Sequence, residues 1–192
     1  MRLWTFQPIE VYEILKNKGI YRCDPNNNGV DKYLIKSYIW LVSEMEKRIG
    51  KRPNGVKLPI WAWHTTYWKH NKPDLRHVEF KCSKPCLLME IEIPDNQVVL
   101  TDFDAWHFVL NHWYLGKSTC EAEHDKEQAW LDTLTNKQRN TEIIKSWQRV
   151  FDISKYSNEW FNRGMFIQAT FWELKLSQVK KIYKVRSKVE HK

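Results

Sequence analysis

A few acids and amides at the ends of predicted strands are the residues best suited to chemistry. In 101–104, Thr101 and Asp102 lie where an apolar strand leads into a helix, so capping explains one acid there. In 167–174, strand alternation places Gln168 on one side with Thr170 and places Glu173 on the other. An acid on an otherwise apolar strand indicates either a sheet edge or an active site, and the sequence alone leaves both open.

Cysteine and histidine offer a second set of reactive groups. Cys82 and Cys86 are spaced C-x3-C, and Cys120 and His124 are spaced C-x3-H. Thiolates and imidazoles hold zinc tetrahedrally, but these spacings are looser than those of zinc fingers. We therefore expect four free thiols and no metal.

The segment 58–77 combines aromatic and basic side chains. Arg76 could bind a phosphate or simply pair with Asp74, and Trp68 lies in a polar stretch that suits an exposed stacking platform. The chain has 11 Trp, and we assign most of them to the core because each is a large apolar body. The tryptophans in predicted strands and helices are Trp61, Trp63, Trp106, Trp113, Trp130, Trp147 and Trp172.

Composition narrows the class of protein. The 192 residues are 42% hydrophobic and 28% charged, which is typical of a globular domain. The chain lacks a run of about 18 apolar residues, a P-loop, a G-x-S-x-G elbow and a G-x-G-x-x-G motif. The opening residues lack the charged-then-apolar layout that a secretion signal is expected to have. We therefore expect no membrane partner, and we expect a cytoplasmic protein because four cysteines do not make a disulfide scaffold.

The elements that must position these residues follow from hydrophobic periodicity and from Gly, Pro and capping signals. They predict one α+β domain over 1–192, with a basic strand and tail from about 175. The expected strands are 2–6, 58–65, 86–94, 98–100, 165–174 and 179–185, with 86–94 and 98–100 forming a hairpin. The expected helices are 9–18, 31–49, 103–115 and 121–149, the last with a break near 136–140.

Charge is distributed unevenly along this order. Residues 1–86 carry 16 Lys and Arg against 8 Asp and Glu, and the whole chain has a net charge of +8. Such an excess is either an ordinary solvated surface or a face that binds an anionic partner such as nucleic acid.

Four segments taken in order resemble the ADP-ribosyltransferase fold, nearest to the DarT-type DNA ADP-ribosyltransferases. They are LWTFQPIEVYEILKNKGI (3–20), LPIWAWHTT (58–66), VVLTDFDAW (98–106) and IQATFWEL (167–174). The whole chain also resembles a bacterial family of unknown function that opens with Trp-Thr-x-Gln and carries Pro-Asp-Leu-Arg in mid-chain.

The first resemblance implies a split, strongly bent mixed or antiparallel sheet with flanking helices and NAD, used as a substrate, in the cleft. It implies a glycosyltransferase-class enzyme that passes ADP-ribose to a nucleic-acid or protein acceptor. Carried over onto this chain, the cofactor-binding residues would be Arg2, Thr5, Gln7, Trp63, His64, Tyr67, Arg76, Thr101 and Asp102, and the catalytic residues would be Glu173 and Gln168.

Two positions depart from that family's pattern. Leu3 stands where the family has a His, and Thr170 aligns with its catalytic Glu, so that Glu173 is the nearest acid, three residues further on. A neutral Thr cannot stabilise developing positive charge as a carboxylate does. A non-catalytic domain that binds nucleic acid or another protein therefore stays open as the alternative.

Overall fold

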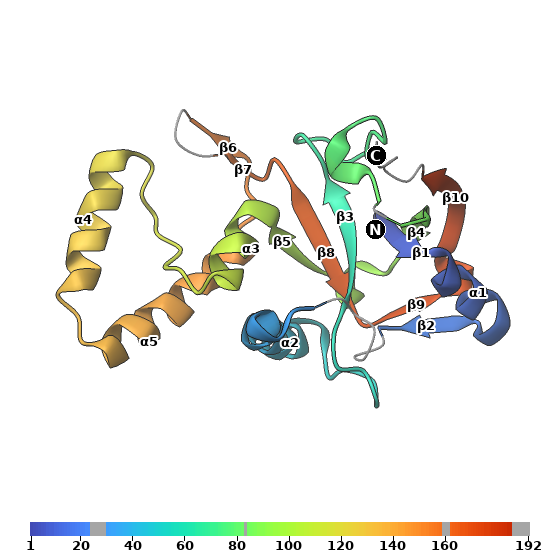
Figure 1. Ribbon diagram of the computed structural model, residues 1–192, viewed down its shortest axis with the longest axis horizontal. Coiled ribbons are helices and arrows are strands. Elements are labelled where there is room, and N and C mark those ends of the chain that lie inside the picture. Colours follow the sequence, from blue (N-terminus) through green and yellow to red (C-terminus); the bar gives the residue numbers. More distant parts are fainter. Residues whose placement is uncertain (24–29, 83, 159–161, 186–192) are drawn as a thin grey trace, which may run out of the picture.

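A six-stranded antiparallel sheet forms the centre of the computed structural model, which describes residues 1–23, 30–82, 84–158 and 162–185. Its strand order is β10-β4-β1-β3-β8-β5 (Figure 1). The strands are β1 (Arg2–Pro8), β3 (Ile60–Thr65), β4 (Cys86–Glu92), β5 (Val99–Asp102), β8 (Ile167–Phe171) and β10 (Val179–Val185). The expected α+β class is confirmed.

The sheet is split between β1 and β3. Strand β1 pairs with β4 along its whole length, whereas its register with β3 in the described residues is the one pair Trp4↔Trp63. Next to that pair, the Thr5 hydroxyl donates to the Trp61 carbonyl at 2.7 Å, which gives that carbonyl a partner where the ladder stops. The two halves of the sheet therefore meet at a narrow seam.

Helices cover both faces of the sheet, and alternation decides which side chains each face receives. One face packs against α1 (Ile9–Lys18) and the small sheet of β2 (Ile20–Arg22) with β9 (Glu173–Lys175), around buried Leu3, Leu15 and Met89. The other face packs against α2 (Ile35–Ile49) and α3 (Phe103–Leu110), around buried Met45 and Trp106. We call the second face the α3 face.

Two helices extend away from the sheet as an arm (Figure 1). They are α4 (Glu121–Asp132) and α5 (Asn136–Ser146), and a capping box at Thr135 starts α5. The hairpin of β6 (Tyr156–Ser157) and β7 (Asn162–Arg163) follows them. The short 3-10 helices are η1 (Lys32–Leu34), η2 (Val78–Phe80), η3 (Asp95–Gln97), η4 (Trp147–Phe151) and η5 (Leu176–Gln178). Among the described residues, every helix is too short or too polar to span a membrane.

The predicted hairpin of 86–94 with 98–100 is wrong. Strand β5 pairs with β8 at the far edge of the sheet, because both edges of β4 are already taken by β1 and β10. The connecting Pro-Asp-Asn forms part of η3 instead of a tight turn. Local turn signals cannot reveal that a strand is already fully paired.

Three other sequence predictions need correction. Trp113 and Trp130 are exposed rather than buried, because α3 ends at Leu110 and the arm presents Trp130 to solvent. The strand expected over 165–174 is two strands, β8 and β9, which belong to different sheets. Cys82 and Cys86 form a disulfide, so those two thiols are not free, while Cys120 is exposed and free. The part of the basic tail beyond 185 lies outside the described residues.

Candidate functional site

A row of polar and aromatic side chains crosses the α3 face at the seam. Trp4 pairs with Trp63, Trp63 pairs with Gln168, and Gln168 pairs with Thr101. Residues directly opposite one another on antiparallel strands point to the same face. The register therefore brings together three of the predicted site residues, Trp63, Gln168 and Thr101. The Thr101 hydroxyl is buried and has no hydrogen-bond partner among the described residues.

Aromatic rings pack around Trp63, the cross-strand partner of Gln168, on this face. The Trp63 ring centroid lies 5.2 Å from Phe103, 5.6 Å from Phe80 and 6.1 Å from Phe166, and Tyr67 packs edge-on against Phe166 at 4.8 Å. Phe80 is buried, and the other four rings are half-buried. We call these five residues the aromatic cluster. A half-buried set of rings beside a side-chain amide suits a planar ligand that stacks and accepts or donates hydrogen bonds.

A strained two-residue turn presents Tyr67. Thr66 and Lys69 exchange backbone hydrogen bonds at 3.0 and 3.1 Å, and Tyr67 and Trp68 between them have φ of 52° and 59°. Bulky side chains rarely adopt this left-handed region, and each such residue costs on the order of 1–2 kcal/mol. The Trp68 indole donates to the Arg163 carbonyl at 3.3 Å, which helps to hold the turn in place. Strain of this kind concentrates at ligand sites.

Asp102 anchors the opposite side of the site. Its carboxylate accepts from Ala105 N at 2.9 Å, which caps α3 as the sequence predicted, and from Gly164 N at 2.7 Å. Burial raises the pKa of Asp102 even though these N–H groups favour the charged form. Asp102 therefore ties α3 to the chain that enters β8, and it does not point free into the site.

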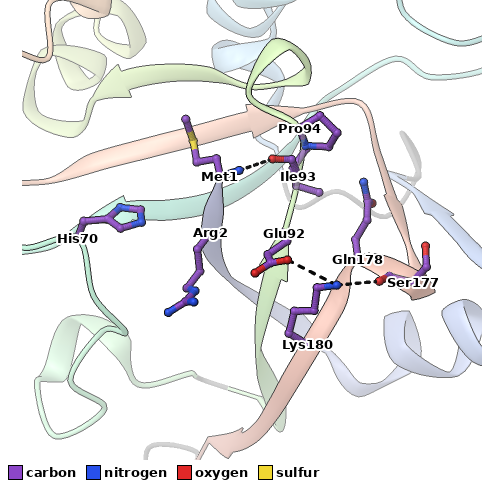
Figure 2. Close-up of a pocket in the computed structure, with 9 residues that line it drawn as sticks. All are labelled: Met1, Arg2, His70, Glu92, Ile93, Pro94, Ser177, Gln178 and Lys180. Carbon is purple, nitrogen blue, oxygen red and sulfur yellow. Dashed lines mark hydrogen bonds and ion pairs between the residues drawn. The ribbon is translucent and has the colours of Figure 1, made fainter.

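Arg2 lies at the other end of the α3 face, in an open pocket of about 530 Å³. Figure 2 shows Arg2 between His70 and the Glu92–Lys180 pair, whose charged atoms are 3.5 Å apart. The His70 ring packs 5.4 Å from Trp4, the first residue of the row, so the pocket adjoins the seam. The cations Arg2 and Lys180 make this end suitable for an anionic group.

His64 lies half-buried next to the same pocket. Its ring lies 4.1 Å from the His70 ring, and its Nδ1 is 2.8 Å from the Thr65 hydroxyl. Burial first, and then the neighbouring His70, lower the pKa of His64 to about 4. His64 is therefore neutral at pH 7 and serves as a hydrogen-bonding group rather than as a cation.

Three of the predicted residues lie away from the row. Thr5 and Gln7 share the opposite face of β1, where the Gln7 amide donates to the Thr5 hydroxyl at 2.7 Å. Arg76 forms a forked pair with Asp74 at the surface, and its hydrogen bonds hold the pKa of Asp74 well below its usual range. The structure thus favours simple pairing over phosphate binding at Arg76.

Glu173 lies beyond the far end of β8 from Gln168. It opens β9, which pairs with β2, and its carboxylate accepts from Arg22 Nε at 2.5 Å. Thr170, which aligns with the catalytic Glu of the resembling family, is fully buried on the α3 face and donates weakly to the Val99 carbonyl. The predicted catalytic pair Glu173 and Gln168 is therefore separated by the length of β8.

The described residues contain no group of three or more His, Cys, Asp or Glu that could hold a metal ion. The disulfide also removes Cys82 and Cys86 as thiolate ligands.

Sequence reasoning missed Phe80, Phe103 and Phe166 of the aromatic cluster. Phe166 could have been found, since it lies two residues before Gln168 and alternation places both on one face. The turn at Tyr67 and Trp68 gave no signal because it lacks the Gly or Asn that usually marks such turns.

Fold and site together define an α+β domain with a split antiparallel sheet and a cluster of aromatic side chains at the seam. The chain belongs to the family described as Domain of unknown function (DUF3841), whose model matches residues 2–180. The predicted resemblance to a family of unknown function is thereby confirmed. Neither the curated proteins nor the solved structures include a significant match to the chain.

Proposed function

We propose that this domain is an ADP-ribosyltransferase-like protein that binds NAD at the seam of its sheet. The nicotinamide ring stacks in the aromatic cluster with its carboxamide facing Gln168, and the diphosphate extends toward Arg2. The observation that carries the proposal is the row Trp4, Trp63, Gln168 and Thr101 on one face, beside the one pair that joins the two half-sheets in the described residues.

Chemical features of this row match the parts of the dinucleotide. Half-exposed aromatic rings stack on a planar base with a gain of about 1–3 kcal/mol per base. The half-buried Gln168 amide offers a donor and an acceptor next to that ring. Arg2 has a half-exposed side chain and lies 3.6 Å from Glu90, an ion pair loose enough to leave guanidinium donors for phosphate.

NAD titration tests this binding, with tryptophan emission and melting temperature as parallel readouts. A ligand that binds only the native state raises the melting temperature. Saturable quenching that weakens in Trp63→Ala and Arg2→Gln supports the site. Arg52→Gln is the matched control, because Arg52 is similarly exposed and its ion pair is with Glu46 at the end of α2. No response at millimolar NAD would contradict the proposal.

Transfer of ADP-ribose is a separate step, for which the resemblance implies Glu173 as the catalytic acid. Glu173 is paired with Arg22 and lies the length of β8 away from Gln168, so its position does not support turnover of NAD whose nicotinamide lies beside Gln168. Loss of turnover in Glu173→Gln with NAD affinity retained would establish the transferase. Full turnover in that variant would remove Glu173 from the mechanism.

A nucleic-acid partner is the second candidate, either as the acceptor or as the sole ligand. The Lys155 ammonium lies 5.7 Å from the Trp68 ring, and the chain carries a net charge of +8. Phosphate contacts release counterions, so the affinity for a single-stranded oligonucleotide is expected to fall steeply between 50 and 200 mM salt. An affinity that does not change with salt would exclude this partner.

A further inference from the structure

A second cavity, of about 480 Å³, lies at the root of the arm. Its walls come from α3, from the segment 114–119, from α4 and η4, and from the β6–β7 hairpin. Ala105, Phe108 and Leu115 give it an apolar floor. Small-molecule sites have this size and this mostly apolar lining, with a few fixed polar groups.

Two arginine–tyrosine pairs face this cavity. The Arg149 guanidinium lies 5.8 Å from the Tyr114 ring, and the Arg163 guanidinium lies 5.6 Å from the Tyr156 ring. The tyrosine rings can stack on a planar base, and planar guanidinium groups suit phosphate oxygens. Lys117 and His124 also line the cavity, while Asp152 is its acid. The balance of charge favours an anionic ligand.

Both guanidinium groups are held in position before any ligand arrives. Arg149 donates to the Leu115 carbonyl, and Arg163 is paired with Asp152. The chain next to Arg163 is fixed in turn, because Gly164 N donates to the buried Asp102 carboxylate. Groups fixed in this way lose little conformational entropy on binding.

We infer that this cavity binds a nucleoside 5′-monophosphate unit, with the base against Tyr114 and Tyr156 and the phosphate on Arg149 and Arg163. The unit is either a free nucleotide or one residue of a single strand. The inference is independent of NAD binding at the seam, because the two sites share none of the residues assigned here to binding.

The probes are AMP, adenosine, inorganic phosphate and an eight-residue oligoadenylate, titrated against the whole protein. We expect AMP to bind at least tenfold more tightly than adenosine or phosphate alone. Arg149→Gln and Tyr114→Leu should each weaken AMP at least tenfold. Lys137→Gln on the exposed side of the arm and Trp63→Ala in the aromatic cluster should leave AMP affinity unchanged.

The remaining outcomes distinguish a free nucleotide from a residue of a single strand, and binding in this cavity from binding at the seam. An oligoadenylate that binds tenfold more tightly than AMP identifies a strand residue as the ligand, and the reverse order identifies the free nucleotide. Because Arg149 also holds the 114–119 segment, melting curves accompany each variant, and Tyr114→Leu decides the matter if Arg149→Gln unfolds. AMP binding that is lost in Trp63→Ala but kept in Tyr114→Leu would overturn the inference, as would no AMP binding at all.

Discussion

The two ends of β8 face different surroundings. At the Gln168 end, half-buried rings leave a side-chain amide beside the seam, and Asp102 braces the entering chain. At the other end, the Trp172 indole donates to the Gly50 carbonyl, and Arg22 neutralises Glu173 in a separate small sheet. Gln168 and Glu173 are five residues apart, and five residues of extended chain span roughly 16 Å. The proposed ligand site lies at the first end, whereas the contacts at the second end join α2 and the small sheet to the rest of the fold.

The largest effect is expected for Asp102, which holds α3 and the chain entering β8 together near Gln168. Asp102→Ala removes the α3 cap and leaves Gly164 N without its acceptor, so it should lower the free energy of unfolding by about 2–4 kcal/mol. Urea denaturation measures the loss. Asp104→Ala, the exposed acid two residues on, is the control and should cost less than about 1 kcal/mol. Equal losses in the two variants would show that Asp102 has no special anchoring role.

Removing the central ring should abolish most binding at this end. Trp63→Ala deletes the side chain that contacts Phe80, Phe103 and Phe166, so NAD affinity should fall by tenfold or more. Isothermal titration measures the change. Trp172→Phe at the other end of β8 should leave the affinity within twofold of the wild type. A greater loss in Trp172→Phe than in Trp63→Ala would reverse the assignment of the two ends.

Acid should weaken the seam through His64. Because burial lowers the folded-state pKa of His64 to about 4, the unfolded chain binds more protons between pH 4 and 6.5. The contribution of His64 to the free energy of unfolding is complete above about pH 6.5. It falls by about 1–2 kcal/mol, after allowing for the partial exposure of the ring, as the pH drops toward 4. The urea midpoints at pH 7 and pH 4.5 should differ less in His64→Gln than in the wild type. Identical pH dependence in both proteins would remove His64 as the cause.

The smallest effect is expected at the Glu173 end. Glu173→Gln breaks a partly exposed ion pair with Arg22, and such pairs contribute about 0–1 kcal/mol. NAD affinity should stay within twofold of the wild-type value. A tenfold loss of affinity would place Glu173 at the ligand and make the separation of the two ends untenable.

Periodicity predicted much of the fold, because amphipathic strands and capped helices carry their signals locally. The cap at Asp102 and the strand around Gln168 follow directly from such signals. Strand pairing does not follow from local signals. The sequence predicts that β5 pairs with β4, because it does not show which strand edges are already occupied. The break at Trp172 was missed for a related reason, since the indole turns to α2 and frees Glu173 to join another sheet.

Two-dimensional NMR of the tryptophan indole N–H groups during NAD titration is the most direct test of this account. Trp63 and Trp172 mark the two ends of β8, and single Trp→Phe variants assign their signals. We expect the Trp63 signal to shift saturably while the Trp172 signal stays in place. A shift at Trp172 without one at Trp63, or no shift at either, would contradict NAD binding at the seam.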